Sequence, residues 1–169
     1  MSLEGFDPVI DAQCRALVLG SFPGAASLRA GHYYAYPQNQ FWPIVAATLG
    51  SDLLSLPFPA RYRLLLASGL GLWDVITRCD RTGSLDQHIR DSQAADLPAL
   101  LDRQPAVSYL LLNGKRAQRD ARRLLATRSR SGLQLVDLPS TSPAHARLSL
   151  ADKLALWRPA LQQAMRPLS

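Results

Sequence analysis

Cysteine and lysine are both scarce in this sequence of 169 residues, which contains two of each. Cys14 and Cys79 lie far apart, form no C-x-x-C pair and have no histidine beside them, so they cannot build a four-cysteine zinc site or iron–sulfur cluster. The three histidines are scattered and lack clustered carboxylates. We therefore expect a protein without a metal or any other cofactor.

Long apolar runs are missing as well. No uninterrupted stretch approaches the roughly 20 residues of a membrane helix, and the first residues lack the basic and apolar regions of a secretory signal. A hydrophobic content of 47% and a charged content of 19% exclude a disordered chain. With no repeat and no flexible linker, we expect one cytoplasmic domain over residues 1–169 that makes no membrane contact.

Basic side chains outnumber acidic ones, and nearly all of the basic ones are arginine. Nineteen basic against thirteen acidic side chains give a net charge of +6, and seventeen of the basic residues are arginine. The planar guanidinium group binds phosphate from two directions, which favours a nucleic acid as partner. An arginine-rich proteome would produce the same bias without any such function.

Short apolar runs alternate with amphipathic stretches along the chain. The apolar runs predict strands at 16–19, 71–76, 107–112 and 133–138, and the amphipathic stretches predict helices at 41–49, 60–68, 94–102 and 115–126. A last helix begins near Leu150 with a capping box of Ser149 and Asp152, and Pro159 is expected to kink it or end its regular part. This order predicts an α/β fold with a parallel sheet covered on both faces, whose ligand lies beyond the carboxyl ends of the strands.

Four loops follow these strands or open their helices. The turn G-S-F-P-G at 20–24 can direct backbone N–H groups at an anion, or it is a plain strand-to-loop turn. Residues 32–42 hold five aromatic rings, suited either to stacking on bases or to packing a core. Within them, Asn39 either caps the following helix or holds a water molecule for attack.

Two more loops carry basic and hydroxyl side chains. A helix that opens at Asn113-Gly114-Lys115 presents a basic stripe, which either follows a phosphate backbone or is a solvated outer face. The stripe consists of Lys115, Arg119, Arg122 and Arg123. The loop 139–145 holds three hydroxyls between two prolines, and such hydroxyls can donate to phosphates. A serine-hydrolase triad with His145 lacks the G-x-S-x-G turn that it requires.

The loops in this order resemble the uracil-DNA glycosylase superfamily, and most closely its hypoxanthine-DNA glycosylase branch. The resemblance covers residues 15 to 160 and rests on five motifs: G-S-F-P-G, Y-Y-x-x-P-x-N-x-F-W, G-L-W-D-V, L-L-x-N-G-K and L-P-S-T-S-P-A. It implies a three-layer αβα sandwich with a central four-stranded parallel sheet. Phe22 stands where better-known branches carry a water-activating Asp or Asn, and Leu138 replaces their histidine before Pro-Ser.

The resemblance also implies roles for individual residues. The catalytic role falls on Asn39, and the base would be bound by Gly20, Ser21, Phe22, Pro23, Gly24, Tyr34 and Asp74. DNA would be contacted by Asn113, Lys115, Ser140, Thr141, Ser142 and His145. Asp74 falls where relatives place a base-recognising Asn, and it either accepts from a base N–H or is a structural acceptor.

The activity implied is that of a monofunctional DNA glycosylase. It would flip a deaminated base, hypoxanthine or also uracil, out of DNA and hydrolyse its glycosidic bond, leaving an abasic site. The expected partner is DNA with deaminated or mismatched bases, bound by a monomer. The alternatives are excision of uracil or thymine opposite guanine, a non-catalytic DNA-binding domain, and a hydrolase of small nucleosides or phosphate esters.

Overall fold

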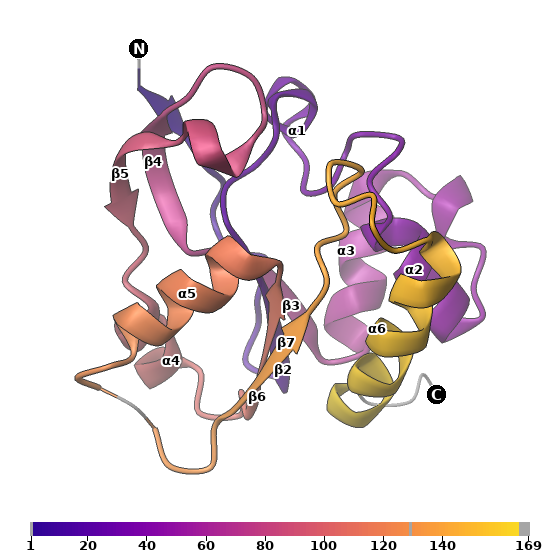
Figure 1. Cartoon of the computed structure of the whole chain (residues 1–169). Coiled ribbons are helices and arrows are strands. Elements are labelled where there is room, and N and C mark those ends of the chain that lie inside the picture. The colour runs from indigo at the N-terminus through magenta and orange to yellow at the C-terminus, as the bar shows by residue number, and fades with distance from the viewer. Residues whose placement is uncertain (1, 129, 166–169) are drawn as a thin grey trace.

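The centre of the computed structural model, which describes residues 2–128 and 130–165, is a four-stranded parallel sheet (Figure 1). Its strands are β2 (Ala16–Gly20), β3 (Leu70–Asp74), β6 (Tyr109–Asn113) and β7 (Gln134–Leu138), in the order β3-β2-β6-β7. All neighbouring pairs run parallel. The four predicted strands and their parallel arrangement are thus confirmed.

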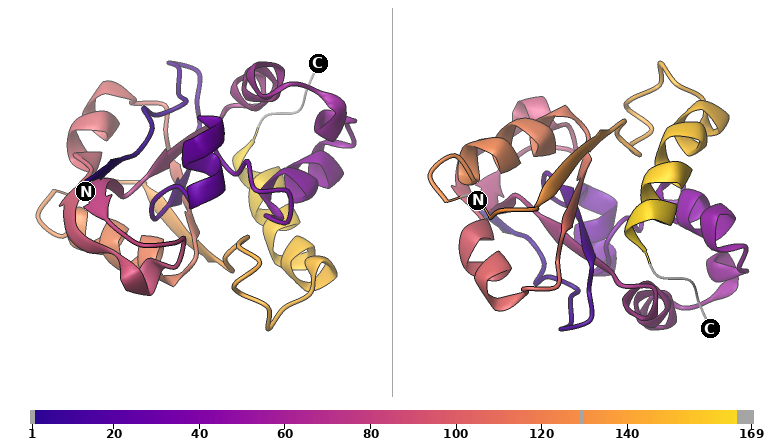
Figure 2. Two further views of the ribbon diagram at one scale, coloured as in Figure 1. Left: turned by 90° about the horizontal axis from the view of Figure 1, so that it is seen from above. Right: turned by 90° about the horizontal axis from the view of Figure 1, so that it is seen from below.

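Helices cover both faces of this sheet, as Figure 2 shows from two directions. One face carries α4 (Leu97–Arg103) and α5 (Lys115–Leu124), which pack on Leu17 and Leu19 of β2. The opposite face carries α2 (Phe41–Leu49), α3 (Phe58–Ala67) and α6 (Leu150–Ala164), which pack on Ala16 and Val18. Side chains alternate along a strand, so a strand buried on both faces must be apolar throughout, as β2 is. The predicted αβα sandwich is confirmed.

A second, antiparallel sheet was not predicted. It consists of β1 (Leu3–Glu4), β4 (Ile76–Asp80) and β5 (Arg90–Ala94), in the order β1-β4-β5. The residues of β5 are polar apart from Ala94 and all are exposed, so no apolar pattern marks this strand in the sequence. The predicted strand at 71–76 is therefore wrong at its end, because β3 stops at Asp74 and Ile76 already belongs to β4.

Several helix boundaries also differ from the prediction. Helix α1 (Ala25–Ala30) and the short 3-10 turns η1 (Leu53–Ser55) and η2 (Asp86–His88) were not predicted. Helix α3 begins at Phe58, before the predicted start at residue 60. Helix α4 begins at Leu97 rather than at residue 94, because the Asp96 side chain accepts from the Ala99 N–H at 3.1 Å and caps the helix there.

The last helix confirms one expectation and contradicts another. Ser149 and Asp152 form the predicted capping box, each side chain accepting from the backbone N–H of the other residue. The prediction that Pro159 ends the regular part is wrong, since α6 continues to Ala164. Trp157, Leu161 and Ala164 are fully buried on both sides of the proline, and this packing offsets the hydrogen bond that proline cannot donate. No helix among the described residues has the length and apolar character needed to span a membrane.

Candidate active site

A pocket of about 790 Å³ opens beyond the carboxyl ends of the parallel strands, where the fold class predicts a ligand. Its walls come from five segments that lie far apart in the sequence: residues 20–29, 33–39, 84–87, 113–116 and 140–145. Asp74 joins them from the end of β3. Every residue singled out from the sequence as catalytic, base-binding or DNA-binding lines this pocket, so the structure brings them all together.

Asp74 is the buried acidic group of the pocket. Its side chain is only 6% exposed, and its Oδ2 atom has no hydrogen-bond partner among the described residues. Burial, reinforced by the negative charge of Asp86 and opposed by Arg81, raises the pKa of Asp74 to about 7. An unpartnered buried carboxyl is costly in a folded protein, and Oδ2 is open to a hydrogen bond from a ligand or a water molecule.

Tyr34 lies beside this carboxyl in a conformation that few residues adopt. Its backbone φ is +54°, in the left-handed region, and its ring stacks on Phe41 with 4.3 Å between centroids. Its hydroxyl accepts from Asn113 Nδ2 at 3.3 Å. Burial, together with the charge of Asp74, raises the pKa of Tyr34 well above its usual value, so the phenol is neutral at physiological pH. Backbone strain of this kind persists only where its surroundings hold it.

Asn113 uses its whole carboxamide inside the protein. Nδ2 donates to Tyr34 and also to Thr141 Oγ1 at 3.1 Å, while Oδ1 accepts from the Thr141 N–H at 3.0 Å. Thr141 is itself 0% exposed, which leaves its hydroxyl no surface for a phosphate. These two residues therefore tie the end of β6 to the loop 139–145 and to Tyr34.

Asn39 makes the local contact expected of a capping residue. Its Oδ1 atom accepts from the Phe41 N–H at 3.0 Å, at the start of α2, although the N-cap position itself is Gln40. The side chain is half-buried and lines the pocket. A carboxamide oxygen has two lone pairs and the amide nitrogen has two N–H groups, so one backbone contact leaves donors and an acceptor for a water molecule.

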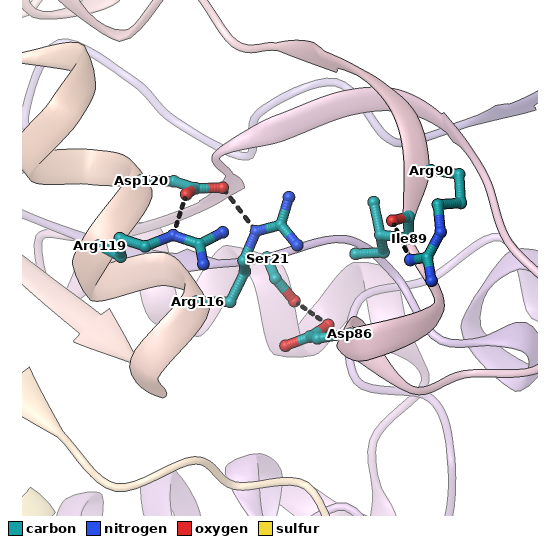
Figure 3. Close-up of polar contacts among 7 residues, drawn as sticks. All are labelled: Ser21, Asp86, Ile89, Arg90, Arg116, Arg119 and Asp120. Carbon is teal, nitrogen blue, oxygen red and sulfur yellow. Dashed lines mark hydrogen bonds and ion pairs between the residues drawn. The ribbon is translucent and has the colours of Figure 1, made fainter.

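The turn 20–24 is held against a loop that sequence analysis did not single out. Ser21 Oγ donates to Asp86 Oδ1 at 2.6 Å (Figure 3), and Ser84 Oγ accepts from the Ala25 N–H at 2.9 Å. Arg81 donates to the Pro23 carbonyl at 2.6 Å and places its guanidinium 5.2 Å from the centroid of the Phe22 ring. No motif or periodic pattern marks residues 81–88, which is why they were missed.

Two side chains of α6 hold the loop 139–145 by hydrogen bonds. Trp157 donates from its indole nitrogen to the Pro139 carbonyl at 2.8 Å, and Lys153 donates to the Ser142 carbonyl at 3.3 Å. The Lys153 side chain is 1% exposed, and burial lowers its pKa. Ser140 and Ser142 each accept from a backbone N–H two residues on, which fixes the turn.

His145 also belongs to this loop. Burial, with the nearby charges of Lys153, Arg147 and Lys115, lowers the pKa of His145 below its ordinary value. The imidazole is therefore mostly neutral at pH 7. It lines the pocket together with Lys115, at the first position of α5.

The basic stripe of α5 is partly neutralised. Arg116 and Arg119 both donate to Asp120, at 2.8 and 3.0 Å (Figure 3), and Arg122 donates to Asp137 at 2.8 Å. Burial alone would raise the pKa of Asp120, but these two arginines hold it below its usual value. Lys115 is the member of the stripe that lines the pocket, and Arg116, which lies beside the stripe on α5, lines it too.

Residues 2–128 and 130–165 contain no group of three His, Cys, Asp or Glu side chains that could hold a metal ion. The pocket is lined by amide, hydroxyl, carboxylate, imidazole and basic side chains.

Comparison with known proteins places the chain in a family. The Uracil DNA glycosylase superfamily model matches residues 8–163. The chain is 34% identical to the Hypoxanthine DNA glycosylase of Methanosarcina barkeri, over 96% of this chain and 100% of that protein. It is 32% identical to the protein of the same name from Methanosarcina acetivorans, over 88% and 92%.

A solved structure agrees with these matches. It is a solution NMR structure from Methanosarcina acetivorans, described as that of a candidate uracil DNA glycosylase. The two folds superpose with a TM-score of 0.79 at 32% identity, over 96% of this chain and 99% of the other. Sequence and fold agree, and the chain belongs to the uracil-DNA glycosylase superfamily.

Proposed function

We propose that the protein is a monofunctional DNA glycosylase that removes hypoxanthine from DNA. It hydrolyses the N-glycosidic bond of the flipped nucleotide and leaves free base and an abasic site. The observation that carries the proposal is the buried Asp74 carboxyl, which lies in the pocket with Oδ2 unpartnered among the described residues. The names of the two Methanosarcina relatives support the same substrate.

Asp74 supplies the recognition. As a carboxylate it accepts the N1–H of hypoxanthine, and as a neutral acid it also donates to the adjacent O6. With a pKa of about 7, both forms are present at physiological pH. Adenine has no proton on N1, so the ionised form rejects it. Uracil presents the same adjacent N–H and C=O at N3 and O4, which keeps uracil as the second candidate base.

Asn39 supplies the water. As the C1′–N bond breaks, its electron pair leaves with the base and the sugar becomes an oxocarbenium-like cation. A water molecule held by the Asn39 carboxamide adds at C1′, and the proton that it loses neutralises the departed base. Charge accumulates on the departing base, where N–H groups of the turn 20–24 receive it. Phe22, which is 6% exposed, offers a small part of its ring to the base. The turn is held by Arg81, Ser84 and Asp86, so it needs little rearrangement during the reaction.

DNA is held around the mouth of the pocket. We assign phosphate contacts to Lys115, Ser140, Ser142 and His145, which line it. Asn113 and Thr141, grouped with these residues in the sequence analysis, act by holding the loop 139–145 in place. The rim must stay open to a duplex, so the protein works as a monomer and as one domain. The two cysteines are buried thiols, which are typical of proteins of the reducing cytoplasm.

The test is alkali-revealed strand cleavage of labelled duplexes that contain one hypoxanthine, uracil, xanthine or G:T mismatch. We expect cleavage of the hypoxanthine duplex, none without alkali, and a loss of about 100-fold in Asn39→Ala. Base release by an unimpaired Asn39→Ala would reduce Asn39 to a local capping residue. Binding without release from any duplex would favour a non-catalytic DNA-binding domain, and turnover of free nucleosides would favour a small-molecule hydrolase.

A further inference from the structure

The Tyr34 hydroxyl and the Asp74 carboxyl converge on one part of the pocket. Both come within 3.0 Å of the position that a Cβ atom on Gly20 would take. Both side chains line the pocket, one from the segment 33–39 and the other from the end of β3. Among the described residues, neither is the hydrogen-bond partner of the other. Two polar groups thus face the same small volume without satisfying each other.

Tyr34 is held firmly in this place. Its ring stacks on Phe41 with the two centroids 4.3 Å apart, and its oxygen accepts from Asn113 Nδ2 at 3.3 Å. Its backbone φ of +54° is a conformation that tyrosine rarely adopts and that costs free energy. A strained backbone that is retained in a pocket indicates that the position of the phenol has a function there.

The phenol proton is not used within the described part of the protein. A tyrosine hydroxyl can donate one hydrogen bond besides those that it accepts, and the contact with Asn113 uses Tyr34 only as an acceptor. Burial and the charge of Asp74 raise the pKa of Tyr34, so the phenol keeps its proton at physiological pH. Asp74 Oδ2 likewise has no partner among the described residues. The pocket therefore presents a hydrogen-bond donor beside a hydrogen-bond acceptor.

We propose that Tyr34 determines base specificity by donating its phenol proton to the carbonyl oxygen next to the ring N–H that Asp74 accepts. In hypoxanthine these atoms are O6 and N1–H, and in uracil they are O4 and N3–H. Adenine and cytosine present the opposite pattern, an amino group beside a ring nitrogen with a lone pair, so the carboxylate would face a lone pair. Guanine and thymine share the N–H and C=O edge, and these two groups do not reject them.

A donor at Tyr34 changes what Asp74 has to do. A carboxylate alone satisfies the N–H of the base and leaves the adjacent carbonyl oxygen buried without a partner, which is costly. With Tyr34 as the donor, the ionised form of Asp74 is sufficient to bind this edge. Negative charge spreads onto the carbonyl oxygen as the base departs, so the hydrogen bond from Tyr34 strengthens in the transition state. The inference rests on the proposed function, because it requires a flipped base in the pocket.

The test compares binding to duplexes whose target nucleotide carries a 2′-fluorine, which destabilises the oxocarbenium-like cation and so prevents base release during the measurement. One duplex contains hypoxanthine. The other contains 6-thiohypoxanthine, which keeps N1–H but has sulfur, a weak acceptor, in place of O6. We expect Tyr34→Phe to weaken binding of the hypoxanthine duplex about tenfold and of the thio duplex less than about twofold.

Tyr33→Phe is the matched control. It removes the hydroxyl of the neighbouring tyrosine, which donates to the Asp7 carbonyl at 2.8 Å and is therefore already used within the protein. Any loss of affinity in this variant should be the same for the two duplexes. The ratio of the two affinities, rather than either affinity alone, thus separates a contact with the base from a structural effect.

Equal losses on the two duplexes in Tyr34→Phe would show that the hydroxyl acts only through Asn113, and would overturn the proposal. Tighter binding of the thio duplex with unchanged binding of the hypoxanthine duplex would overturn it too, because the hydroxyl would then only crowd the sulfur. Base release from the hypoxanthine duplex without fluorine is measured in parallel. A wild-type protein that shows the expected preference but releases no base would defeat the proposed glycosylase while supporting the role of Tyr34.

Discussion

Gly20 and Asp74 lie directly opposite each other at the carboxyl ends of β2 and β3. A Cβ atom on residue 20 would lie 2.5 Å from Asp74 Oδ1 and 3.0 Å from the Tyr34 hydroxyl. The absence of a side chain at Gly20 is thus what lets the carboxyl and the phenol share the end of the sheet. The pairing of two neighbouring parallel strands fixes where the acidic group of the pocket stands.

Gly20→Ala is expected to displace Asp74 and to lower the rate of hypoxanthine release by about 10–100-fold, because a misplaced recognition group weakens binding of the transition state. The protein should still fold, since the clash involves side-chain atoms. Single-turnover rates, together with unfolding in urea, measure both quantities.

Gly132→Ala is the matched control. Gly132 has φ +81° and nothing within 4 Å of an added Cβ, so alanine is strained there but meets no neighbour. It should cost about 1 kcal/mol of stability and leave the rate unchanged. A Gly20→Ala protein as active as Gly132→Ala would contradict the packing assigned to residue 20.

The raised pKa of Asp74 makes a prediction about stability and pH. A carboxyl whose pKa rises from 3.8 to about 7 on folding binds its proton more tightly in the folded state. It therefore destabilises the fold progressively as pH rises through that range, and fully above about pH 7. Asp74→Asn lacks this penalty. Its stability relative to the wild type should be about 2 kcal/mol more favourable at pH 8 than at pH 5, as measured by urea unfolding. A difference independent of pH would show that Asp74 titrates normally.

The variant Asn113→Ala tests whether Asn113 holds the loop 139–145 in place or contacts DNA directly. The variant strands the N–H and hydroxyl of the buried Thr141, which we expect to cost about 2–3 kcal/mol of stability. Tyr34→Phe, which removes only the hydroxyl that accepts from Asn113, should cost less. Thermal unfolding of both variants without DNA makes the comparison. Unchanged stability in Asn113→Ala, with weakened DNA binding, would favour a direct DNA contact.

Salt dependence distinguishes the basic side chains of α5. Lys115 lines the pocket, so Lys115→Gln should reduce the slope of log binding constant against log salt by about 1. Arg122 is paired with Asp137, and Arg122→Gln should change the slope less. Fluorescence-anisotropy titrations between low and moderate salt give the slopes. Equal slopes for the wild type and Lys115→Gln would remove Lys115 from the phosphate contacts.

The parallel sheet and the convergence of the loops could be predicted because both have strong local signals. The runs that became β2 and β6 are apolar on both faces, and the order of the loops follows from the alternation of strands and helices. Since carboxyl ends of parallel strands meet at one edge, residues as distant as Gly20 and Ser140 had to approach each other.

The second sheet could not be predicted, since its signal is tertiary. The exposed β5 is stabilised by pairing with β4, which no sequence pattern reveals. The contacts of Asp86 and Arg81 with the turn 20–24 escaped prediction for the same reason. The alternative that Pro159 ends the regular part of the helix was wrong because local propensity does not include the burial of Trp157 and Leu161.

The position of the β4–β5 hairpin affects how the pocket of such an enzyme can change in evolution. The hairpin supplies one wall of the pocket but lies outside the parallel sheet. Val75 alone links the end of β3 to the start of β4. The loop of the hairpin can be lengthened, shortened or exchanged without altering the strand ends that carry Asp74 and Asn113. Selection for a new damaged base can therefore act on the shape of this wall while Asp74 and Asn113 keep their places.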